Sequence, residues 1–189
     1  EDFNKDITKG TYFVLSKDVV IDGDLDMSAR GNYSIDLQGH TLTVNGTLTY
    51  STDDAKDIKI GNTKKKAYVD GGVVDADKIV INALNANVEI LSNTQTSRAE
   101  ILAKQVTLTS MTSTDGICVG AQKVALKGAI STANAAQIEL SSTAVDANAQ
   151  VSATGKINGK LVAQKVDLTA TASSGITSIV LDADSTAQI

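Results

Sequence analysis

The chain has 189 residues with a net charge of −5 at pH 7, and 42% of its residues are hydrophobic, which fits one folded domain with its own core. Its single cysteine excludes an intramolecular disulfide framework, and its single histidine leaves no Cys/His zinc site within this chain. The acidic balance argues against nucleic-acid binding, and no long apolar run predicts a membrane-spanning helix.

The N-terminal segment 1–15 carries bulky side chains. Phe3, Tyr12 and Phe13 lie there, and no aromatic residue follows Tyr68. A stack of β-strands needs a polar or bulky cover over its open end. We therefore expect residues 1–15 to form an N-terminal cap and residues 16–189 to form the stack.

Short runs of alternating apolar and polar residues follow one another along the rest of the chain. They are rich in Val, Ile, Leu and Thr, and Gly, Asn, Asp and Ser separate them, as is typical of strands and turns. The chain has no proline, as expected where nearly all backbone N–H groups belong to strand ladders. The sequence therefore predicts an all-β fold. The clearest runs are 41–44, 47–50, 87–90, 106–109 and 137–140.

One short phrase recurs in the chain. Its anchor valines Val124, Val145 and Val166 are evenly spaced, and Val106 precedes Val124 by a slightly shorter step. A β-solenoid explains such spacing, because each rung must return to the same register above its neighbour. We expect rungs of about 21 residues, because this is the spacing between the three evenly spaced anchor valines. The copies are residues 76–83, 103–110, 121–128 and 163–170, with a fainter one at 142–149.

The alternating pattern continues almost to the last residue. It runs through Ile179, Val180 and Leu181, and nothing resembling a cap precedes Ile189. We expect the natural protein to continue beyond Ile189, so that this chain is a C-terminally truncated fragment.

Two stretches resemble known surface proteins of bacteria. Residues 35–44, IDLQGHTLTV, resemble a phrase from the early rungs of right-handed parallel β-helices, including autotransporter passenger domains. Residues 152–170 resemble the haemagglutinin-type repeat of secreted bacterial adhesins, and the two stretches cover about a quarter of the chain. Filamentous haemagglutinins also carry Asn-Pro signatures, so the lack of proline makes an autotransporter passenger the closer likeness.

The resemblance implies a right-handed parallel β-helix that serves as a non-enzymatic adhesin stem on the bacterial cell surface. Such a stem is extracellular and anchored to the outer membrane only through a translocator domain that this chain lacks. Its implied partners are a host or bacterial surface receptor, a matrix component or a second copy of itself, and no cofactor is implied. Two alternatives stay open: a polysaccharide-acting enzyme on the same fold, and a passive spacer for a distal binding domain.

Three alternating carboxylates, Asp22, Asp24 and Asp26, are expected to share one face of a strand. A calcium site is the functional interpretation. The EF-hand pattern fails, because Met27 and Tyr33 stand where Gly and Glu are required. Solubilising surface charge is the favoured interpretation, and no metal ligands are predicted.

Catalytic residues are not predicted either. The acidic run Asp53, Asp54 and Asp57 could supply glycosidase carboxylates, but it is typical of a loop without a groove. The only histidine, His40, is interpreted as a turn residue, and Cys118 is expected to face away from its neighbours.

Two segments are predicted to be surface loops that bind a partner. One holds a lysine triplet suited to a polyanion. The other lies in the longest step of the repeat, which we expect to project a loop from the side of the rod. The six candidate residues are Lys64, Lys65, Lys66, Asn93, Thr94 and Gln95.

Overall fold

The computed structural model describes residues 13–28, 34–61, 71–121, 123–127, 130–132, 137–139, 150–153, 157–168 and 176–188, the last four ranges through their backbone. These residues are almost entirely β-strand. The strands are β1 (Phe13–Val14), β2 (Val19–Ile21), β3 (Leu25–Asp26), β4 (Ile35–Asp36), β5 (Thr41–Ser51), β6 (Ile58–Gly61), β7 (Val73–Gly120), β8 (Lys123–Leu126), β9 (Ile130–Thr132), β10 (Gln137–Glu139), β11 (Gln150–Ala153), β12 (Ile157–Leu168) and β13 (Ile176–Gln188).

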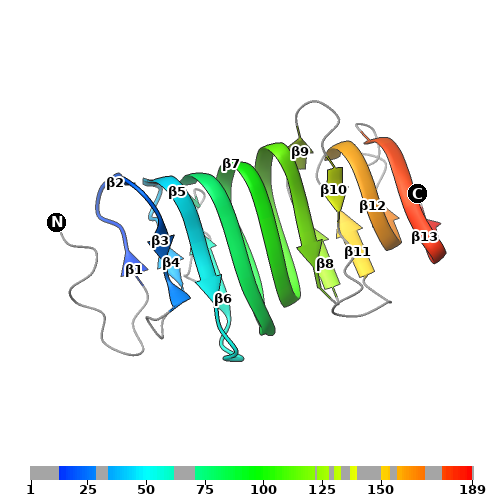
Figure 1. Cartoon of the computed structure of the whole chain (residues 1–189), viewed down its shortest axis with the longest axis horizontal. Coiled ribbons are helices and arrows are strands. Elements are labelled where there is room, and N and C mark those ends of the chain that lie inside the picture. Colours follow the sequence, from blue (N-terminus) through cyan, green and yellow to red (C-terminus); the bar gives the residue numbers. More distant parts are fainter. Residues whose placement is uncertain are drawn as a thin grey trace.

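The strands join into one parallel, curled sheet, which is compatible with the all-β solenoid that the sequence predicts. The sheet has 13 strands. The chain advances along the long axis of the molecule from its N-terminus to its C-terminus, and the ribbon of β7 curves back beside itself several times (Figure 1). Each pass of the chain from one register partner to the next is termed a rung. Within the described ranges, no helix is long and apolar enough to cross a membrane.

The rungs differ in length because the corners between strands differ. Leu42 pairs with Val19 of the preceding rung and with Val74 of the following rung, and the second of these steps is the longer. The step from Val151 to its partner Val166 is shorter than either. A parallel ladder fixes only the register of the strands, so a corner can gain or lose residues without disturbing the stack.

The repeat phrase is confirmed in part: the copies at 103–110 and 121–128 stack as register partners, whereas Ile79 of the copy at 76–83 pairs with Leu48. Val106 does pair with Val124. The next partner is Val151 rather than Val145, which lies outside the described residues, and Val151 then pairs with Val166. The long step from Val124 to Val151 and the short step from Val151 to Val166 together span two expected periods. The sequence therefore shows a regular spacing although these two rungs differ in length.

The core is a set of apolar columns inside the curl. Leu48 lies between Leu25 and Ile79 as register partner of both, and all three side chains are buried. Burying one such side chain contributes roughly 1.5–3 kcal/mol. Tyr50, in the same strand, is the largest fully buried side chain among the described residues.

Of the predicted cap, residues 1–12 lie outside the described part of the chain. The described remainder includes Phe13, which packs partly buried against the core, and Leu15, which is 3% exposed. β1 pairs with β4 at one end of the strand order.

Candidate functional site

Polar residues recur at one corner of five successive rungs. Residues 22–24 lie under 45–47, because Asn45 donates to Asp22 Oδ1 over 2.9 Å and Thr47 N donates to Asp24 Oδ1 over 2.7 Å. The next rung continues the column with a shift of register: Val44 pairs with Ala76 and Thr47 pairs with Lys78, so that Asp77 falls opposite Asn45 and Gly46. We call this column the polar corner. Its five triplets are 22–24, 45–47, 75–77, 95–97 and 112–114.

In the first triplet each carboxylate accepts a hydrogen bond from the next rung, Asp24 from a backbone N–H and Asp22 from a side-chain amide. The chain bends at Gly23, where φ is +114°, so β2 and β3 are separate strands and not the single strand that the sequence predicts. Because the strand ladder is interrupted here, the backbone N–H of Thr47 donates its hydrogen bond to the Asp24 carboxylate. Gly46 is required beside it, because a Cβ there would lie 2.6 Å from Asp24 Oδ1 and 2.7 Å from the Gly23 carbonyl carbon.

This arrangement corrects the interpretation of the three carboxylates. Asp24 and Asp22 bind the next rung, and Asp26 Oδ1 accepts from Ser28 N over 2.8 Å, so these groups do more than solubilise the surface. Among the described residues there is no group of three or more His, Cys, Asp or Glu side chains that could hold a metal ion.

In the last three triplets the corner opens into a groove. β7 runs through this region as one continuous strand, so its backbone groups pair mainly along the ladder. The groove encloses about 440 Å³, within the range of small-molecule sites. Its lining residues come from three adjacent rungs of β7. They are Asp75, Ala76, Asp77, Gln95, Thr96, Ser97, Thr112, Ser113 and Thr114.

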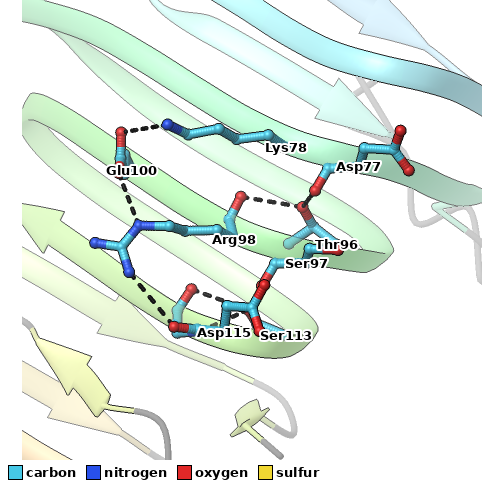
Figure 2. A network of polar contacts seen from close by, with 9 residues as sticks. Asp77, Lys78, Thr96, Ser97, Arg98, Glu100, Ser113 and Asp115 are labelled. Atoms are coloured by element: carbon cyan, nitrogen blue, oxygen red, sulfur yellow. Dashed lines mark hydrogen bonds and ion pairs between the residues drawn. The ribbon is translucent and has the colours of Figure 1, made fainter.

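Two buried hydroxyls fix the floor of the groove (Figure 2). Thr96 is 7% exposed, and its hydroxyl contacts the carbonyl oxygens of Asp77 and Arg98 at 3.3 and 3.1 Å. Ser113 is fully buried; its hydroxyl lies 2.6 Å from Ser97 O and accepts from Gly116 N over 3.1 Å. These bonds tie the three rungs together, so the groove is preformed.

The basic residues nearest the groove are paired with Glu100 and do not line the cavity. Arg98 Nε donates to Glu100 Oε1 over 2.7 Å, and Lys78 Nζ lies 3.1 Å from Glu100 Oε2 (Figure 2). The Arg98 hydrogen bond, followed by that of Lys78, lowers the pKa of Glu100 below its usual range. The groove therefore keeps the negative charge of Asp75 and Asp77, whose exposed carboxylates have no hydrogen bond or ion pair with another described residue.

The structure divides the six predicted binding residues. Lys64, Lys65 and Lys66 lie outside the described residues. Asn93, Thr94 and Gln95 belong to strand β7, so the loop predicted there is wrong. Asn93 is exposed, Thr94 is 2% exposed with its hydroxyl 3.0 Å from that of Ser92, and Gln95 lines the groove.

The carboxylates considered for glycosidase chemistry lie in one exposed segment. Asp53, Asp54 and Asp57 lie exposed between β5 and β6, where Asp57 Oδ1 accepts from Asn87 over 3.0 Å. None of these three carboxylates lines the groove on β7.

The single histidine and the single cysteine of the chain lie as the sequence predicts. His40 N donates to Leu37 O over 2.9 Å, which confirms it as a turn residue, and its ring lies 3.5 Å from Asp18 Oδ1. Cys118 is half-buried between the fully buried Ile117 and Val119, so it does face away from both.

Sequence reasoning missed most of the groove. Asp75 and Asp77 alternate with Ala76 as in any exposed strand, and the triplet 112–114 is an ordinary polar run. The usable signal is the recurrence of short runs rich in polar residues at 75–77, 95–97 and 112–114, whose two unequal steps a fixed period does not find.

Comparison of the chain with protein-family models, with curated proteins and with solved structures finds no match in any of the three.

Proposed function

We propose that this chain is a segment of a bacterial cell-surface adhesin, a rigid and non-enzymatic stem that mediates adhesion or self-association. The observation that carries the proposal is the preformed polar groove, which three rungs of β7 build on the outside of the sheet. A chain that only separates two other domains has no need of such a groove. The resemblance of residues 35–44 and 152–170 to passenger domains and adhesin repeats supports the same function.

The proposal includes the finer architecture, a closed right-handed parallel β-helix. Its support is the parallel pairing of successive rungs, in which Ile117, Ile138, Leu161 and Ile179 follow one another as partners. Connections between parallel strands of one sheet are right-handed in nearly all proteins. Successive rungs of such a helix bring distant segments into one rigid surface.

The proposed partners are a receptor on a host or bacterial surface, a matrix component, or a second copy of the chain. The proposed location is extracellular, at the bacterial cell surface, with an outer-membrane anchor supplied by another part of the protein. Contacts made by one groove are weak, and many copies on one surface add up through multivalency.

The test displays the folded chain at high density on beads. Bead-to-bead clumping and bead adherence to host cells and to matrix-coated surfaces are scored, with beads carrying an unrelated β-rich protein as the control. Clumping or adherence above the control supports the proposal. If the beads neither clump nor adhere although a β-rich circular dichroism spectrum shows that the chain is folded, the proposal is contradicted and the chain is a passive spacer.

A further inference from the structure

We propose that the groove on β7 binds a glycan that carries protonated amino groups, such as a glucosamine-containing chain. The inference rests on the adhesive function proposed above and names the ligand class of the same site. Three features of the groove carry it: its charge, the kind of polar groups on its walls, and its rigidity.

The charge of the groove selects for a cation. Asp75 and Asp77 lie on the same side of the strand, separated by the inward-facing Ala76, and both are exposed. Among the described residues no Lys, Arg or His lines the cavity, and the neighbouring Lys78 is held by Glu100. An ammonium group therefore meets two carboxylates and no competing cation from the groove's lining, which gives charge-assisted hydrogen bonds.

The other walls select for a ligand rich in hydroxyl groups. They carry the carboxamide of Gln95 and the hydroxyl-bearing residues Ser97, Thr112 and Thr114. Amides and hydroxyls both donate and accept, as sugar hydroxyls do. A simple polycation uses the two carboxylates and leaves this wall without a partner, whereas an amino sugar satisfies both parts of the groove.

The rigidity of the groove favours recognition by hydrogen bonds. The described residues that line it include no aromatic ring on which a sugar could stack. The Thr96 and Ser113 hydroxyls are instead occupied in linking neighbouring rungs, so the outward groups are held at fixed spacing. Preformed polar sites lose less entropy on binding than mobile ones.

The experiment titrates the full 189-residue chain with three soluble probes and measures affinity by calorimetry. The probes are a glucosamine tetrasaccharide, the same tetrasaccharide fully N-acetylated, and tetralysine. We expect the glucosamine probe to bind at least about tenfold more tightly than either of the others. The double variant Asp75→Asn/Asp77→Asn should lose about tenfold in affinity for it.

The control variant is Asp53→Asn/Asp54→Asn, which removes the same charge from an exposed segment that does not line the groove. If the two double variants lose equal affinity for the glucosamine probe, the loss reflects only the net charge of the chain, and the proposal is overturned. Equal binding of the acetylated sugar, or equal binding of tetralysine, would also overturn it. If the glucosamine probe does not bind while beads carrying the chain still adhere, the ligand class is wrong and the adhesive function stands.

Discussion

At the scale of single residues, side-chain oxygen atoms at the corners accept the N–H groups that the ladder leaves unpaired. Asp18, Asp24, Ser28 and Ser34 each use a side-chain oxygen to accept a backbone N–H from a residue 23 to 25 positions later. Each acceptor lies at or beside a break between short strands. Backbone N–H groups that leave the ladder at such breaks find a partner in these side chains, which allow a rung to bend without losing its contact with the next.

We expect Gly46→Ala to destabilise the fold by about 1–3 kcal/mol. The new Cβ would meet Asp24 Oδ1 at 2.6 Å and the Gly23 carbonyl oxygen at 2.8 Å, so the corner must open and the bond to Thr47 N must lengthen. Urea unfolding followed by circular dichroism measures the change. Asp53→Ala, in the exposed segment after β5, is the control; equal stability of the two variants would refute the packing argument.

We expect Tyr50→Phe to raise stability by about 1 kcal/mol. The Tyr50 hydroxyl is fully buried and has no hydrogen-bond partner among the described residues, so its removal abolishes a desolvation penalty. Thermal unfolding of the two proteins at equal concentration tests this. A drop in the melting temperature would mean that the hydroxyl has a partner.

Tyr50 also makes the stability of the fold depend on pH in the alkaline range. Burial raises the pKa of Tyr50 far above its usual value, so the folded chain disfavours the phenolate. Above pH about 10 the unfolded chain ionises and the folded chain does not, so stability must fall as the pH rises. In Tyr50→Phe this contribution is absent, and its alkaline loss of stability, measured by urea unfolding at pH 7 and at high pH, should be smaller.

At the scale of elements, the charged triad of Lys78, Arg98 and Glu100 on β7 joins two neighbouring rungs. Lys78 lies on one rung, and Arg98 and Glu100 lie on the next (Figure 2). Because the Glu100 side chain is 38% exposed, solvent screens the ion pairs, and each contributes at most about 1 kcal/mol. Register partners Lys59 and Glu89 form an equivalent pair, 3.1 Å apart, between β6 and β7.

We expect Glu100→Gln to lower stability at pH 7 by about 1 kcal/mol or less. The lowered pKa of Glu100 means that its contribution is present above its ordinary pKa and is lost as the pH falls through the lower folded value. Urea unfolding at pH 7 and at pH 3 measures the difference. A gap between the two proteins that stays constant or widens at low pH contradicts the assignment of the triad.

Sequence patterns predict this level of structure unevenly. Alternation and the recurring phrase are local, so the strand column from Val106 to Val124 could be predicted. The partner Val151 could not, because the number of residues between successive partners changes from rung to rung, and a fixed period overlooks this change. Gln95 was selected for the wrong reason: it lies in a strand, and it lines a groove that exists only when three rungs are stacked.

At the scale of the whole molecule, the stack is a one-dimensional array in which each rung contacts its neighbours. Its length can therefore change by whole rungs. Residues 105–108 and 123–126 occupy the same register on successive rungs, so removal of residues 106–123 joins Gln105 to Val124 in phase.

We expect the deletion of residues 106–123 to leave a folded chain that unfolds cooperatively, with lower stability because one rung is lost. Deletion of residues 106–114, which removes about half a rung, is the control and should prevent folding of the later rungs, because the register is lost. Circular dichroism and urea unfolding distinguish the two. Equal damage by both deletions would show that the rungs are not independent repeating units.

The central claim is that the groove on β7 is the adhesive surface of this chain. The most direct measurement compares the adherence of beads that carry the wild-type chain, Asp75→Asn/Asp77→Asn or Asp53→Asn/Asp54→Asn at equal density. We expect the first double variant to lose about tenfold or more of the adherence, since multivalent display amplifies each weakened contact, and the second to match the wild type. Full adherence of Asp75→Asn/Asp77→Asn would contradict the claim.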